Sequence, residues 1–172
     1  EAMQKIMDTG EMPLPPYITT ALADQSRYQT VFAHDQKSSA APTAGLHFTP
    51  ELLARIREAG VEICEVELVV GLDTFKPISV ENPLDHVIHT ESYRVPADTI
   101  DACKRARESG GRVIAIGTTA TRALESAATF GELQGRTNLF ITPGYQWKVV
   151  DMMMTNFHMP RTTLLLMVES FN

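Results

Sequence analysis

The sequence is short of cysteine and has no excess of positive charge, and each shortage narrows the class of protein. Its two cysteines, Cys64 and Cys103, are far apart, and neither belongs to a C-x-x-C pair. They predict reduced, structural thiols in a cytoplasmic protein. Fifteen basic residues against twenty-one acidic ones give a net charge of −6. This balance argues against binding of nucleic acid by bulk charge, although it is compatible with a local basic patch.

Long apolar segments are also missing. No run approaches the roughly 18 residues that span a bilayer, so we expect no membrane partner. Hydrophobic residues nonetheless make up 44% of the chain, enough for one domain with a real core or at most two small domains. The first residue is Glu1, and the helical pattern of residues 164–171 has no stop signal. We therefore expect these residues to be part of a longer protein.

Helical and extended patterns alternate along the chain and predict an α/β fold in which a mixed sheet is layered with helices. Apolar residues at alternate positions predict a strand over residues 61–70, and continuous apolar runs predict buried strands. These buried strands cover residues 113–116 and 139–141. Predicted helices run from Thr49 and Pro50 to Gly60, and over residues 98–108, 121–129 and 164–171.

Small and stiff residues precede His47 and Phe48 in the segment from Ala40 to Phe48, which leads directly into the first of these helices. A loop at a helix N-terminus presents free N–H groups to a carboxylate or phosphate. A tight turn from strand to helix would have the same pattern, and spacing alone favours the turn. Residues 12–18 hold three prolines, as in a rigid linker or a fixed groove wall that carries Tyr17.

A second polar cluster is Asp85-His-Val-Ile-His-Thr-Glu91. In an extended chain His89 and Glu91 share one face, whereas His86 lies opposite Glu91. Two histidines and a carboxylate can bind zinc or non-haem iron, but the spacing is not the H-E-x-x-H of a metal-binding helix. We therefore favour a hydrogen-bonded acid/base pair over a metal site.

Further polar clusters occur between strands and helices. Gly117-Thr-Thr-Ala-Thr-Arg122 follows a predicted buried strand and favours a ligand or anion cradle, although the lysine and spacing of a P-loop are missing. Arg122 and Glu125 are three apart, which predicts a pair on the helix surface. Thr155-Asn-Phe-His158 is a similar cluster. A cationic run, Lys104, Arg105, Arg107 and Arg112, indicates a solvated helix face or, alternatively, an anchor for phosphates.

Five motifs occur in one order along the chain. They are Met12-Pro-Leu-Pro-Pro-Tyr-Ile18, Ala41-Pro-Thr-Ala-Gly-Leu-His-Phe48, Asp85-His-Val-Ile-His-Thr-Glu91, Gly117-Thr-Thr-Ala-Thr-Arg-Ala-Leu-Glu-Ser126 and Thr155-Asn-Phe-His158. Over nearly all its length the chain resembles the S-adenosylmethionine:tRNA ribosyltransferase-isomerases of queuosine biosynthesis. The resemblance implies transfer and isomerisation of the ribosyl moiety of S-adenosylmethionine onto 7-aminomethyl-7-deazaguanine at the tRNA wobble position. Epoxyqueuosine is formed, and adenine and methionine leave.

The resemblance also implies a monomer without a metal, in which an α/β domain is paired with a smaller β-barrel domain. Residues 1–18 then link to the β-barrel domain, and residues 19–172 form an incomplete α/β catalytic domain. The chain lacks the N-terminal portion of the family, with most of the β-barrel, and the C-terminal segment. Glu169 stands where the family tends to be small and apolar. We expect these residues alone to hold only half of the site.

The chemistry implied by the resemblance needs an acid near the departing adenine and a base for the carbon beside the sulfonium. The candidates are His47, His89 and His158, with Glu91 as carboxylate partner. Candidates for binding S-adenosylmethionine are Thr43, Gly45, Phe48, Gly117, Thr118, Thr119, Asn156 and Phe157. Candidates for contacts with the modified tRNA are Tyr17, Arg122, Tyr145 and Lys148. Tyr145 and Trp147 also qualify as aromatic faces for the sulfonium.

We expect His47, His89, Thr118 and His158 to lie around one cleft, because all occur at predicted strand ends. Two other classes of function stay open at this point. One is a metal-dependent hydrolase that uses His86, His89 and Glu91. The other is a non-catalytic RNA-binding fragment.

Overall fold

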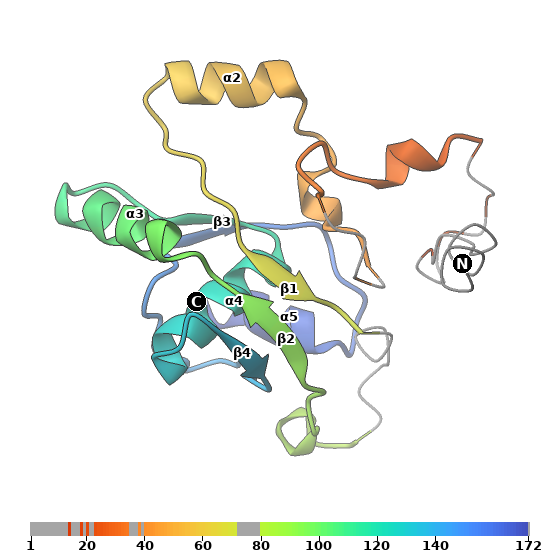
Figure 1. The fold of residues 1–172 in the computed structure, drawn as a ribbon. Helices are drawn as coiled ribbons and strands as arrows, with labels where there is room; N and C mark the ends of the chain where they lie inside the picture. Colours follow the sequence, from red (N-terminus) through yellow and green to blue (C-terminus); the bar gives the residue numbers. More distant parts are fainter. Residues whose placement is uncertain are drawn as a thin grey trace, which may run out of the picture.

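A computed structural model describes residues 14, 18, 20, 23–34, 38, 40–71 and 80–171. Its α-helices are α2 (Pro50–Glu58), α3 (Ala97–Glu108), α4 (Thr118–Phe130) and α5 (Thr163–Glu169). Its strands are β1 (Glu67–Val69), β2 (Glu91–Arg94), β3 (Ile114–Ile116), β4 (Gln134–Thr137) and β5 (Met152–Met154), and η2 (Thr43–Gly45) is a short 3-10 turn. Helices and strands alternate, which confirms the α/β class (Figure 1). Most of the predicted linking segment 1–18, including Tyr17, lies outside the described residues.

The strands pair in two ways. β1, β2 and β4 form an antiparallel sheet in which β2 is central, with Leu68 opposite Tyr93 and Tyr93 opposite Gly135. β3 and β5 form a parallel pair in which Ile116 lies opposite Met154. The predicted mixture of strand directions is therefore present, but among the described residues it is divided between two sheets.

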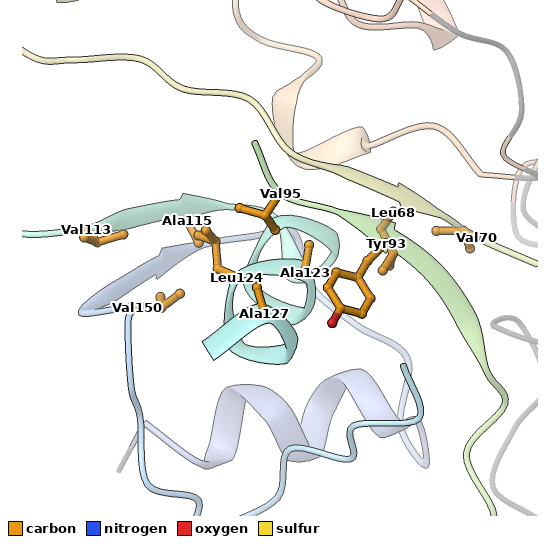
Figure 2. Packing of buried hydrophobic residues seen from close by; sticks show 10 residues of the cluster. All are labelled: Leu68, Val70, Tyr93, Val95, Val113, Ala115, Ala123, Leu124, Ala127 and Val150. Atoms are coloured by element: carbon orange, nitrogen blue, oxygen red, sulfur yellow. The ribbon is translucent and has the colours of Figure 1, made fainter. Parts of the chain in front are cut away.

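Helix α4 lies at the centre of the core. Figure 2 shows its Ala123, Leu124 and Ala127 among apolar side chains from both sheets. The two alanines are small enough to let the strands approach the helix closely. Every residue of α4 from Thr121 to Ala127 is buried. Because four of those seven are polar or charged, their side chains require partners inside the protein.

Several predicted boundaries are wrong, and pairing explains most of them. The predicted strand 61–70 shortens to β1, because residues 61–66 have no partner strand. No strand forms over residues 139–141; the chain pairs with β2 earlier, as β4. β3 is not covered on both faces, since Ile114 is 50% exposed. α4 begins three residues before its predicted start, directly after Gly117. Strand formation thus follows available partners more than local hydrophobicity.

The predicted start of helix α2 is confirmed. The Thr49 side chain accepts a hydrogen bond from the Leu52 N–H, Pro50 is the first helical residue, and Gly60 follows the end with a φ of 85°. No residue of α2 is buried, and Figure 1 shows the helix on extended arms away from the sheets. None of the described helices is both long enough and apolar enough to cross a bilayer.

Candidate functional site

The carboxyl ends of β3 and β5 bring two predicted motifs together. The Gly117 N–H donates a 2.8 Å hydrogen bond to the carbonyl of Met154, so Gly117–Thr119 and Thr155–His158 leave the parallel pair at the same edge. Ligands of α/β proteins commonly bind at such an edge. Gly117 is the N-cap of α4 and has no side chain to bond the first N–H groups of the helix. The first turn of α4, with the half-buried Thr118 and Thr119, therefore points free donors toward this edge.

The η2 turn packs against the same glycine. A Cβ atom added at Gly117 would lie 3.4 Å from the Cβ of Ala44, and the φ of 93° at Gly117 also disfavours any side chain there. Gly45 is closely packed as well, since its added Cβ would lie 2.7 Å from Cζ of Phe32. Packing thus accounts for glycine at position 45. The segment with Thr43, which is half-buried, is held beside the start of α4.

Arg122 joins the fourth motif to the third. Its Nη1 donates to Oε2 of Glu91 at 2.6 Å, and its Nη2 donates to the carbonyl of His89 at 3.0 Å. The other carboxylate oxygen of Glu91 lies 2.9 Å from Nε2 of His89. This confirms that His89 and Glu91 share a face of the chain. Three of the five motifs are therefore linked by contacts within the first two turns of α4, and a fourth, Thr155–His158, directly follows the Met154 that bonds to Gly117.

The surface pair predicted for Arg122 and Glu125 is wrong. Arg122 is 6% exposed and its guanidinium is bonded to Glu91, so it is also poorly placed for the predicted contact with tRNA phosphates. Burial lowers the pKa of Arg122, and the nearby Glu91 opposes that shift. An arginine keeps its charge at such a site, so the cation compensates the buried carboxylate.

The cluster of His89, Glu91 and Arg122 has the geometry of an oriented imidazole. The Glu91 side chain is 2% exposed and the His89 side chain is 18% exposed. The carboxylate is therefore shielded from solvent, whereas the ring is partly accessible. A buried carboxylate on one ring nitrogen fixes the tautomer and orientation of a histidine. The arrangement holds the His89 ring in one orientation, which suits proton transfer.

The other two predicted histidines differ from His89 and from each other. His158 is half-buried, its Nε2 lies 3.2 Å from Oγ1 of Thr155, and burial lowers its pKa, which favours the neutral ring. His47 is exposed and its ring lies 4.1 Å from that of Phe48. Asn156 is exposed as well, and Phe157 is fully exposed. A single cleft that holds all three histidine side chains stays a prediction.

The sequence interpretation missed the role of Glu125. This side chain is fully buried and accepts hydrogen bonds from the backbone N–H groups of Lys148, Val149 and Val150 at 2.8–3.0 Å. It also accepts a bond from the Tyr145 hydroxyl at 2.9 Å. The small or apolar neighbours Ala123, Leu124 and Ala127 are the signal that could have indicated that Glu125 is a buried acceptor. Glu125 holds residues 145–150 against α4.

Tyr145 and Trp147, predicted to contact ligands, are parts of this packing. The Tyr145 hydroxyl lies between Glu125 and Oγ1 of Thr129, which is 3.1 Å away. The Tyr145 ring meets Trp147 edge-on at 5.3 Å. Trp147 stacks on Phe171 at 4.0 Å, and its Nε1 donates to the carbonyl of Ser170. The aromatic group thereby ties the end of α5 to the core.

Because of Tyr145, the stability of the protein should fall at alkaline pH. Burial, with the Glu125 carboxylate, raises the pKa of Tyr145 to about 12 from an ordinary value of 10.0. The folded protein therefore holds this proton more tightly than the unfolded chain does. The resulting stability is complete below pH 10 and should be lost as the pH rises toward 12. Urea unfolding of wild type and Tyr145→Phe at several pH values measures the effect: the loss should be smaller in the variant, and equal losses would contradict it.

The metal alternative finds no support. The His86 ring packs edge-on against Phe140, with 6.3 Å between the ring centroids, while the His89 ring bonds to Glu91. Among the described residues no group of three histidine, cysteine or acidic side chains is arranged to hold a metal ion.

Known proteins resemble this chain along its whole length. The family model described as "Queuosine biosynthesis protein" matches residues 1–172. An S-adenosylmethionine:tRNA ribosyltransferase-isomerase of Desulfitobacterium hafniense is 51% identical over 172 residues, which cover 97% of this chain and 50% of the relative. One from Trichlorobacter lovleyi is 54% identical over 168 residues, which cover 94% and 49%.

A solved structure agrees with these matches. The crystal structure of an S-adenosylmethionine tRNA ribosyltransferase from Thermotoga maritima has a TM-score of 0.58 and 40% identity, covering 74% of this chain and 40% of that one. The chain spans about half the length of the curated relatives it matches. It belongs to the family of queuosine biosynthesis proteins that includes the S-adenosylmethionine:tRNA ribosyltransferase-isomerases.

Proposed function

We propose that the full-length protein transfers and isomerises the ribosyl moiety of S-adenosylmethionine onto 7-aminomethyl-7-deazaguanine at the tRNA wobble position. The names of its relatives support the donor, the tRNA and the reaction class. The modified base, the epoxyqueuosine product, the cytoplasmic location and the monomeric state are further parts of the proposal. We also propose that residues 19–172 are an incomplete catalytic domain whose site is closed by the β-barrel domain of the longer chain.

The observation that carries the proposal is the buried carboxylate of Glu91 between His89 and Arg122. The reaction needs one group that gives a proton to the leaving adenine and one that takes a proton from the carbon beside the sulfonium. His89, held by Glu91, suits the base, because the carboxylate stabilises the imidazolium that forms. Arg122 is a positioning residue in this scheme, because it neutralises and orients Glu91 without reaching the substrate.

The start of α4 and its neighbours suit the donor. The methionine carboxylate of S-adenosylmethionine matches the free N–H groups of the first turn of α4, at Thr118 and Thr119. The half-buried ring of Phe48 offers an aromatic face to the sulfonium cation. His158 is a second candidate for the base, because burial lowers its pKa and favours the neutral ring that can accept a proton.

Adenine release by the full-length enzyme with tRNA that carries the modified base tests the proposal. His89→Gln should lower the rate about 10²–10⁴-fold, the usual contribution of a positioned acid or base. His86→Gln, a change of the same kind in the same motif, should leave the rate within about twofold. Thermal melts should show both variants folded. A full rate in His89→Gln would remove His89 from the mechanism, and no adenine release by wild type would overturn the proposed function.

A further inference from the structure

A groove lies at the other end of α4 from the His89 cluster, between α3, the C-terminal turn of α4 and residues 148–149. It has a volume of about 370 Å³. It is lined by Ile100, Cys103, Lys104, Arg107, Ala127, Ala128, Gly131, Leu133, Lys148 and Val149. None of the candidate acid/base residues lines it, and the reaction described above makes no use of it.

The charge of this groove is opposite to that of the chain. Three of its lining residues are cations and none is a carboxylate, although acidic residues outnumber basic ones by twenty-one to fifteen in the sequence. Two carboxylates pair loosely with groove cations from outside the lining. Asp101 lies 3.7 Å from Lys104 Nζ, and Asp151 lies 3.5 Å from Arg107 Nε. Such partly exposed pairs are weak and can exchange for another anion.

Lys148 shows that the positive charge of the groove does not come from helix α3 alone. It comes from a loop, so the favourable position of Lys104 and Arg107 near the C-terminus of α3 does not explain it. No ion pair among the described residues involves its ammonium group. Its backbone is fixed, because its N–H bonds to Glu125 at 3.0 Å and its carbonyl accepts a bond from Arg107. The loop that carries the ammonium group therefore need not be ordered when an anion binds.

We propose that this groove is a docking site for the phosphate backbone of the RNA substrate, so the inference rests on the proposed function. The fourteen steps from Gly117 to Gly131 place the groove about 20 Å along α4 from the reacting end. An RNA whose reacting base lies at one end of α4 has further phosphates within that reach. The apolar floor lowers the local dielectric and strengthens ion pairs with phosphate. Contacts of this type position a nucleic acid without reading its sequence.

The test is binding of an unmodified tRNA transcript to the full-length protein, measured by fluorescence anisotropy between about 50 and 200 mM salt. Lys104→Ala/Lys148→Ala should weaken binding on the order of tenfold or more at about 0.1 M salt. A plot of the logarithm of the association constant against log [salt] has a negative slope. The variant should make this slope shallower by about 1–2, since two phosphate contacts are lost. Arg105→Ala/Arg112→Ala removes the same charge from exposed positions outside the groove and should change affinity less than about twofold. Arg107 is left intact because it supports the loop.

Adenine release measured in parallel separates this inference from the proposed function. The groove variant, Lys104→Ala/Lys148→Ala, should have a higher KM for tRNA than wild type and the same kcat at saturating tRNA. If wild type binds tRNA but releases no adenine, the proposed reaction fails while the binding data still decide the groove. Three results would overturn the docking site. They are an equal loss of tRNA affinity in the two double variants, an unchanged affinity in Lys104→Ala/Lys148→Ala, and no tRNA binding by wild type. Equally effective displacement by polyglutamate would also overturn it, and would indicate an acidic protein partner.

Discussion

Glu125→Ala should lower the free energy of unfolding by about 3–6 kcal/mol, the largest stability effect that we expect from one substitution. The variant leaves three backbone N–H groups and the Tyr145 hydroxyl without their acceptor. Each buried donor without a partner costs about 1–3 kcal/mol, reduced where water can enter the space. Because domains are typically stable by only about 5–15 kcal/mol, the variant should be largely unfolded at physiological temperature or melt far below wild type.

Urea unfolding of the full-length protein and the variant measures this loss. Glu58→Ala is the matched control, since Glu58 is an exposed residue in the last turn of α2, and its effect should stay within about 0.5 kcal/mol. Glu125→Gln should also be destabilised, because an amide has one acceptor oxygen where the carboxylate uses two. A loss below about 1 kcal/mol in Glu125→Ala would show that other groups hold residues 145–150.

The elements that the sequence predicts well are those determined by local chemistry. The α2 helix begins at Pro50 because Thr49 caps it and ends before a glycine in the left-handed region, and these signals need no tertiary information. The predicted pair of His89 and Glu91 is confirmed for the same reason, since two residues on one face of an extended chain are neighbours wherever the chain goes.

Predictions that depend on distant partners are less successful. Residues 139–141 are apolar enough for a strand, but β2 pairs with the polar residues of β4, and hydrophobicity does not reveal which segment reaches that edge. Likewise, Arg122 and Glu125 are neighbours on a helix, yet each finds its partner on another segment, at Glu91 and at residues 145–150. Their burial follows from the packing of α4 against both sheets, which no local pattern specifies.

The pair of Arg122 and Glu91 provides the second large effect. Arg122→Met should cost about 3–5 kcal/mol of unfolding free energy, because it leaves the Glu91 carboxylate buried without its cation. Adding Glu91→Gln removes that charge, so the double variant should regain much of the lost stability. The amide introduced by Glu91→Gln cannot stabilise an imidazolium at His89 as a carboxylate does. Adenine release by the double variant should therefore stay at least about 10²-fold below wild type.

Urea unfolding and adenine release by wild type, the two single variants and the double variant complete the cycle. A positive coupling of about 2 kcal/mol or more in stability is expected, since contacting charges are not additive. Arg136→Met serves as the control, because Arg136 is an exposed arginine on the neighbouring strand β4 and should change neither quantity appreciably. If the double variant regains activity together with stability, Glu91 acts only in folding. If the changes in unfolding free energy of the two single variants simply add in the double variant, Arg122 does not compensate the charge of Glu91. The proposal that the pair orients His89 would then be wrong.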